Sequence, residues 1–263
     1  MTASPESATS RRVLVWDAPV RVFHWLLAAS FLGAFVTAES ERWRLVHVSL
    51  GYTVAGLVLW RLLWGVMGTR HARFSSFVRG PGAVMTYLRS LLGNRAEHHV
   101  GHNPAGGWAI VALLTGSAVL TLTGWATYQD LGPGWLEDLH EGLGNGLLAL
   151  VAVHVLGVVV SSRLHRENLV RSMVDGRKDA DASQGISRAW PSLAALMVVA
   201  VLGFWGWQAS QAPAAGGEFL AGDPSQQVQG ARTGQGDGRE QGRSERRERH
   251  DRRERHGASS GRD

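Results

Sequence analysis

The 263-residue chain contains no cysteine. This absence excludes disulfide bonds, thiolate zinc sites, iron–sulfur clusters and the C-x-x-C-H motif that attaches haem covalently. Any metal or metal-bearing cofactor must therefore be held by histidine, methionine or carboxylate side chains.

The chain also lacks the high average hydropathy of many membrane proteins, because its mean hydropathy is only -0.07. That average combines long apolar stretches in most of the first 208 residues with a polar tail. A membrane-spanning helix needs about 20 mostly apolar residues. Five segments meet this requirement: Val20–Ala38, Leu45–Met67, Trp108–Tyr128, His140–Ser162 and Trp190–Ala209. We therefore predict an all-α membrane protein with a four-helix transmembrane bundle and a fifth transmembrane helix.

Lysine and arginine are missing from the connection before His140, which carries Asp130, Glu137 and Asp138. Basic residues gather instead in the N-terminal segment and in the second and fourth connections: Arg11, Arg12, Arg21, Arg70, Arg73, Arg79, Arg89, Arg95, Arg163, Arg166, Arg171, Arg177 and Lys178. Lysine and arginine collect on the cytoplasmic side of membrane proteins. We predict a multi-pass protein of the bacterial cytoplasmic (inner) membrane with a cytoplasmic N-terminus. The net charge of +5 then reflects orientation among membrane lipids rather than nucleic-acid binding.

The same patterns predict the domain boundaries. Residues 1–12 form a cytoplasmic segment, 13–180 the transmembrane bundle, 190–209 the additional helix and 210–263 a periplasmic tail. The tail segment Arg239–Arg255 has no apolar residue, so it cannot bury a core and is predicted to be disordered. His250 and His256 are interpreted as part of this solvated tail rather than as metal ligands. Between the second and third spans, Gly82–Leu92 follows Pro81 and predicts a short interfacial helix.

Four histidines fall in or at the spans: His24, His47, His140 and His154. Ionisable residues are costly inside a membrane and therefore indicate function. His140 and His154 are fourteen positions apart, so they share one helix face at depths that differ by roughly 21 Å. Because successive helices alternate in direction, His47 lies at the outer depth and His24 at the inner depth.

The predicted pairs are therefore His47 with His140 and His24 with His154. Haem b takes two axial imidazoles from facing helices, so the spacing predicts two haem b groups stacked in one four-helix bundle. The main alternative is a histidine-lined metal or proton transporter. A transporter is expected to have carboxylates in mid-span, and the spans have none there.

Glycines accompany the proposed ligands on the same helix faces. Gly51 follows His47 by four residues, and Gly144 follows His140 by four. Each leaves room for a porphyrin, although small residues also serve helix packing in membranes. Arg61 is fourteen residues after His47, at the depth of the inner site, and is predicted to pair with a haem propionate. The alternative for Arg61 is a side chain that extends to the membrane interface.

His102 and Asn103 precede the third helix on the predicted cytoplasmic side. They are candidates for contact with a quinone near the inner haem. Helix capping by Asn103 before Pro104 explains the same residues without a ligand.

Several short motifs together resemble the prokaryotic cytochrome b561 family, which includes the cytochrome b subunit of nickel–iron hydrogenases. The resemblance covers about residues 15–178. The motifs are Trp16-Asp17, Arg21, His24-Trp25, Arg61-Leu62-Leu63-Trp64-Gly65, Ala72-Arg73-Phe74, Gly101-His102-Asn103-Pro104, Gly106-Gly107, Thr123-Gly124, His140, His154, Glu167-Asn168-Leu169 and Met173-Val174-Asp175-Gly176-Arg177-Lys178.

The resemblance implies a four-helix haem-b bundle that exchanges electrons with the quinone pool, with the same four histidines as ligands. It also implies a periplasmic redox partner, either a hydrogenase or a c-type cytochrome. An electron-transfer subunit is thus expected, with no catalytic residues of its own. The alternative is an independent oxidoreductase that reduces quinone with a small molecule, as superoxide oxidases do. The fifth span and the charged tail depart from the compact family pattern.

Overall fold

The computed structural model describes residues 11–92 and 99–211. Its long helices are α1 (Ala18–Thr37), α2 (Arg44–Met67), α5 (Pro104–Tyr128), α6 (Trp135–Leu164) and α8 (Pro191–Gln211). All five are long and apolar enough to cross a membrane, which confirms the five predicted spans and the all-α class. Predictions for residues 1–10, for Arg95 and for the tail with His250 and His256 fall outside the described residues.

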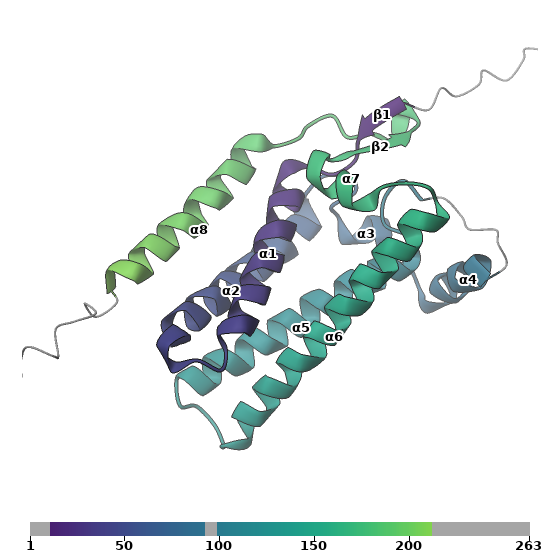
Figure 1. Cartoon of the computed structure of the whole chain (residues 1–263). Helices are drawn as coiled ribbons and strands as arrows, with labels where there is room; N and C mark the ends of the chain where they lie inside the picture. Colours follow the sequence, from purple (N-terminus) through teal and green to yellow (C-terminus); the bar gives the residue numbers. More distant parts are fainter. Residues whose placement is uncertain (1–10, 93–98, 212–263) are drawn as a thin grey trace, which may run out of the picture. The chain divides into compact units, whose positions relative to one another are not determined.

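The bundle is built from helix pairs. Helix α1 packs along α2, α5 packs along α6, and α2 joins the two pairs through its contacts with α5; these four helices lie side by side in Figure 1. Buried apolar side chains of these helices form one core cluster, which Met197 of α8 joins: Phe23, Phe31, Val54, Leu57, Val58, Leu114 and Leu147. Many other large apolar side chains on the spans, such as Leu59, Leu122 and Val153, are exposed. An exposed apolar surface of this extent is typical of helices that face lipid.

Helix direction gives the bundle two ends. One end of the bundle contains the start of α1, the end of α2, the start of α5 and the end of α6. We call it the inner end, and we call the opposite end the outer end. Two capped helices begin at the inner end: Asp17 Oδ1 accepts a hydrogen bond from the Val20 amide (2.8 Å), and Asn103 Oδ1 accepts one from the Gly106 amide (2.7 Å). Each cap precedes a proline in the first turn, where a missing amide hydrogen costs nothing.

Helix α6 begins five residues before the predicted span, at Trp135 rather than at His140. Glu137 and Asp138 lie in its first turn, where negative charge is stabilised by the helix dipole. His140 is therefore held inside a formed helix and not at a frayed terminus.

The shorter helices are the α-helices α3 (Phe74–Phe77), α4 (Pro81–Leu92) and α7 (Leu169–Asp175), with the 3₁₀ turns η1 (Glu41–Trp43) and η2 (Ala182–Gln184). Helix α4 confirms the short helix predicted at Gly82–Leu92. The sequence did not predict a small antiparallel sheet in which β1 (Arg11–Leu14) pairs with β2 (Arg177–Ala180). This sheet joins the segment before α1 to the segment after α7 (Figure 1).

The fifth span contacts α2 through polar side chains. Trp205 Nε1 donates a hydrogen bond to Thr53 Oγ1 (2.8 Å), and Gln208 Nε2 donates one to Ser49 Oγ (3.3 Å). Hydrogen bonds between helices are a common source of association in membranes. Helix α8 is therefore attached to the outer half of α2.

Candidate functional site

At the outer end, the rings of His47 on α2 and His140 on α6 face each other. Their centroids are 6.2 Å apart, and their planes are nearly perpendicular at 88°. The structure thus brings together the predicted outer pair from two helices that are far apart in the sequence.

Both outer rings are oriented through the same nitrogen. His47 Nδ1 lies 2.8 Å from the Ala34 carbonyl oxygen, and His140 Nδ1 lies 3.1 Å from the Leu120 carbonyl oxygen. A carbonyl oxygen only accepts, so each Nδ1 carries the hydrogen and donates it. The hydroxyl oxygen of Thr123 is also 3.1 Å from His140 Nδ1. In each ring Nε2 is then the nitrogen available to bind a metal.

This geometry fits a haem iron between the two rings. Metal–imidazole bonds of about 2 Å on opposite sides of one ion place two ring centroids roughly 6 Å apart. The observed 6.2 Å agrees with that separation. His47 and His140 would hold a haem here, and the haem would supply one-electron redox chemistry.

The neighbouring glycines divide into two groups. A methyl group at Gly51 would meet no atom of the described residues within 4 Å, and one at Gly144 would meet only Leu120 Cδ1 at 3.9 Å. Close helix packing in the described part of the chain therefore explains neither glycine. Gly124 is different, because a methyl group there would lie 2.6 Å from His140 Cε1. Gly124 is thus needed for the observed position of the His140 ring.

At the inner end, the structure places His24 of α1 and His154 of α6 close enough for an electrostatic interaction. His24 Nδ1 is buried and has no hydrogen-bond partner among residues 11–92 and 99–211. The His24 ring also packs edge-on against Trp25, with centroids 5.0 Å apart. His24 therefore lies near its predicted partner His154, but no carbonyl oxygen of the described residues orients its ring as the outer rings are oriented.

Arg61 lies at the inner end and is only 3% exposed. Its Nη2 donates a hydrogen bond to the Ala72 carbonyl oxygen (3.0 Å), and its guanidinium carbon lies 4.9 Å from the centroid of the Phe74 ring. Its Nη1 is buried without a partner in the described part of the chain. The side chain is enclosed by protein and is not exposed. A buried guanidinium with one free nitrogen fits a propionate partner.

His102 packs between two aromatic rings at the same end, 4.5 Å from the ring centroid of Trp16 and 4.7 Å from that of Phe77. Burial, together with the nearby charges of Arg61 and Lys178, lowers the pKa of His102 to about 3. The imidazole is therefore neutral at physiological pH. Asn103 caps α5. Helix capping was the alternative to quinone contact that the sequence suggested.

Asp17 lies beside the inner histidines, and the sequence did not indicate its role there. Its carboxylate is fully buried and accepts hydrogen bonds from Thr69 Oγ1 (2.6 Å) and Trp64 Nε1 (3.1 Å), in addition to the α1 cap. It also interacts electrostatically with Arg61. Asp17 therefore ties the start of α1 to the end of α2 beside the inner pair. Its only sequence signal was its place in the Trp16-Asp17 motif.

Five apolar spans with His47 and His140 brought together between two of them fit the class of transmembrane cytochromes. The model of the prokaryotic cytochrome b561 family matches residues 15–176, which is more than half of the chain. The chain belongs to the prokaryotic cytochrome b561 family. It is accordingly an integral membrane b-type cytochrome that holds haem b and transfers electrons.

Curated relatives agree with this assignment. A probable Ni/Fe-hydrogenase B-type cytochrome subunit of Bradyrhizobium diazoefficiens is 27% identical over 226 residues, which cover 67% of this chain and 90% of the relative. The protein of the same description from Azotobacter vinelandii is 28% identical over 211 residues, covering 62% of this chain and 87% of the relative. A probable Ni/Fe-hydrogenase 1 B-type cytochrome subunit of Escherichia coli K12 is 27% identical over 143 residues, which cover 44% of this chain and 60% of the relative. No solved structure matches the chain.

Proposed function

We propose that the protein is a di-haem cytochrome b that carries electrons across the cytoplasmic membrane between a hydrogenase and the quinone pool. The observation that carries this proposal is the outer pair, in which His47 and His140 face each other at 6.2 Å with both Nδ1 atoms bound to carbonyl oxygens. His154 follows His140 on the same helix after fourteen residues, so a second haem lies roughly 21 Å deeper. The haems supply one-electron redox chemistry, while the chain supplies ligands and orientation.

The residues that would hold the groups are His47 and His140 for the outer haem, with Gly51 and Gly144 leaving space beside them. His24 and His154 would hold the inner haem, and the free Nη1 of Arg61 would bind a propionate. The neutral imidazole of His102 and the cap residue Asn103 lie at the inner end and would receive the quinone headgroup.

The partner proposal rests on the relatives, which are described as subunits of Ni/Fe hydrogenases. The proposed orientation rests on the arginine-rich inner end, which would face the cytoplasm. The outer haem and the additional helix would then meet the partner from the periplasmic side, and residues 210–263 would be periplasmic. Fusions of a reporter to residues at either end of the spans would test the orientation.

The haem assignment is tested by two matched substitutions in the protein purified in detergent. We expect two haem b per chain, loss of the inner haem in His154→Ala, and loss of the outer haem in His140→Ala. Haem content by pyridine haemochrome and reduced-minus-oxidised spectra measure both. Fewer than two haems in the wild type, or loss of neither haem in the variants, would contradict the assignment. Quinone reduction by a small reductant without a partner protein would instead support the independent oxidoreductase.

A further inference from the structure

The two helices that carry the inner histidines belong to different helix pairs. Helix α1 packs mainly along α2, whereas α6 packs mainly along α5. At the outer end, each pair orients its own histidine through a carbonyl oxygen of the partner helix. His24 Nδ1 has no such bond within the described residues. The position of His24 relative to α6 therefore depends on other contacts of α1.

Such a contact exists between α1 and α7, the short helix that follows α6. Arg21 Nη1 donates a hydrogen bond to the Val174 carbonyl oxygen (2.5 Å), and Trp25 Nε1 donates one to the Met173 carbonyl oxygen (3.2 Å). Arg21 and Trp25 are four residues apart on one face of α1, and they flank His24 in the sequence. The first turns of α1 are thus bound to the last carbonyls of α7.

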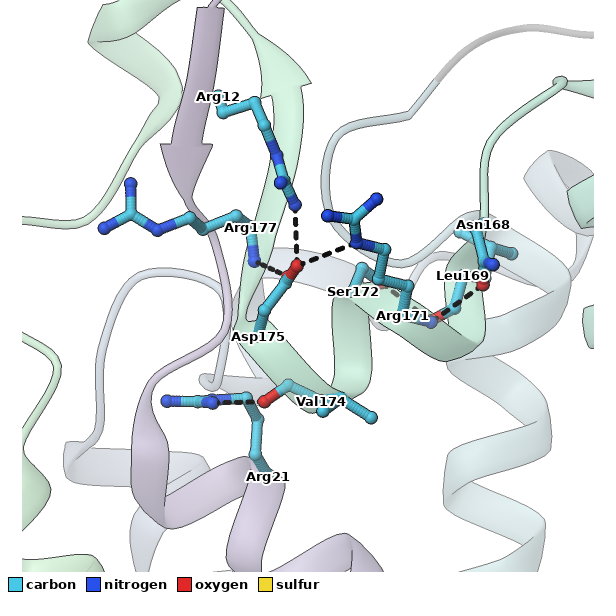
Figure 2. Close-up of polar contacts among 9 residues, drawn as sticks. All are labelled: Arg12, Arg21, Asn168, Leu169, Arg171, Ser172, Val174, Asp175 and Arg177. Carbon is cyan, nitrogen blue, oxygen red and sulfur yellow. Dashed lines mark hydrogen bonds and ion pairs between the residues drawn. The ribbon is translucent and has the colours of Figure 1, made fainter.

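Asp175 holds this junction together through three separate elements, as Figure 2 shows. Its carboxylate binds Arg12 of β1 at 2.6 Å and Arg171 of α7 at 3.3 Å, and it accepts the amide of Arg177 in β2 at 2.9 Å. Hydrogen bonds between ionised groups are shorter and stronger than neutral ones. Asp175 is therefore a link between the segment before α1 and the segments after α6.

Gly176 completes the junction. It adopts φ +78°, and a methyl group there would lie 2.6 Å from the Trp16 carbonyl oxygen and 3.1 Å from Arg21 Nε. Its own carbonyl oxygen accepts hydrogen bonds from the amides of Val15 (2.8 Å) and Trp16 (3.0 Å). Only glycine allows this backbone conformation and this close approach at low cost.

We propose that Arg21, Trp25, Asp175 and Gly176 form a clamp that positions His24 opposite His154. The four residues act on the inner haem through His24, so they are positioning residues and not ligands. This inference rests on the proposed function for its effect on haem, but the clamp itself is a property of the protein chain.

The clamp can be measured without haem, because the chain has no native cysteine. Cysteines introduced by Ala29→Cys on α1 and Val155→Cys on α6, both at exposed positions, accept spin labels whose separation reports on the two helices. We expect a single narrow distance distribution in the full-length protein, and a broader one after Asp175→Asn. Glu41→Gln is the matched control, since it removes a carboxylate that pairs with Arg44 (3.8 Å) at the outer end. It is expected to leave the distribution unchanged.

Redox titration and electron paramagnetic resonance of the same holoprotein then test the positioning role. The inner haem is identified as the component that His154→Ala removes. We expect Asp175→Asn and the milder Trp25→Phe to shift the midpoint potential and the electron paramagnetic resonance signal of the inner haem. Both substitutions should also speed the loss of the inner haem roughly tenfold. The signals of the outer haem should stay unchanged. Partial recovery in Asp175→Glu is also expected.

Two results would overturn the proposal: a distance distribution that Asp175→Asn does not alter, or a broadened distribution with an unaltered inner haem. A wild-type protein without haem would refute the proposed function alone, because the distance measurement would still report on the clamp.

Discussion

The outer and inner histidine pairs use the same side chains in different surroundings. At the outer pair, two backbone carbonyl oxygens of neighbouring helices bind the Nδ1 atoms and orient both rings. At the inner pair, His24 Nδ1 has no partner in the described ranges, and buried polar residues from loops and helix ends gather instead: Asp17, Arg61 and His102. The outer geometry therefore follows from helix packing alone, whereas the inner geometry also depends on segments outside the spans.

This difference has a practical consequence for substitutions. Changes in the helix faces around His140 are expected to act on the outer pair only. Changes in the polar network of the inner end are expected to act on the inner pair only, because the two depths are separated by about four helical turns.

The largest effect is expected from Gly124→Ala. The new methyl group would lie 2.6 Å from His140 Cε1 and would push the ring out of line with His47. We expect the affinity for the outer haem to fall at least about tenfold, while the inner haem stays bound. Haem content and spectra measure both effects. Gly142→Ala is the control on the ligand helix, since a methyl group there meets no described atom within 4 Å. Two wild-type haems in Gly124→Ala would show that the outer ring is not fixed by this contact.

A smaller effect is expected from Arg61→Gln at the inner end. The buried positive charge of Arg61 favours the reduced, less positive haem, so its removal should lower the inner midpoint potential by roughly 60 mV, about 1.4 kcal/mol for one electron. Redox titration resolves the two haems. Arg73→Gln, an exposed arginine at the same end, is the control. An equal shift of both haems would contradict a specific pairing of Arg61 with the inner haem.

The smallest effect is expected from acid, through His102. The pKa of His102 is lowered to about 3 in the folded protein, chiefly by burial, and is about 6.5 in an unfolded chain. The unfolded chain therefore binds more protons between these values, so the contribution of His102 to stability is complete above pH 6.5 and is lost as the pH falls toward 3.

Thermal unfolding of the protein in detergent measures this contribution. Between pH 7.5 and 5, His102→Gln should lose less stability than the wild type, by roughly 3 °C in the unfolding temperature. Asn103→Ser, which keeps a capping side chain, is the control and should retain the wild-type slope. If the unfolding temperature fell equally with pH in the wild type and in His102→Gln, a group other than His102 would cause the acid sensitivity.

Much of the fold was predictable because its signals are local. Apolar runs of about 20 residues define spans wherever they occur. The fourteen-residue step from His140 to His154 defines two depths on one helix face, whatever the helix packs against. The capping role of Asn103 could likewise be read from its place before Pro104.

The contacts that orient the inner pair were not predictable in this way. Arg12 and Asp175 are 163 residues apart in the sequence, and Arg21 and Val174 are 153 apart. The segment Arg177–Ala180 is too short and too charged to indicate a strand by itself. Likewise, the sequence did not show that Gly124 packs against His140, because the two residues lie on different helices.

The amino-acid pattern thus specifies which residues can meet at each depth, since helical rise and apolar length are properties of short stretches of chain. Whether a ring is held by a carbonyl oxygen, a hydroxyl group or a distant clamp depends on which helices become neighbours. That choice is made by packing and by pairing between residues far apart in the chain, so it appears only in the folded molecule.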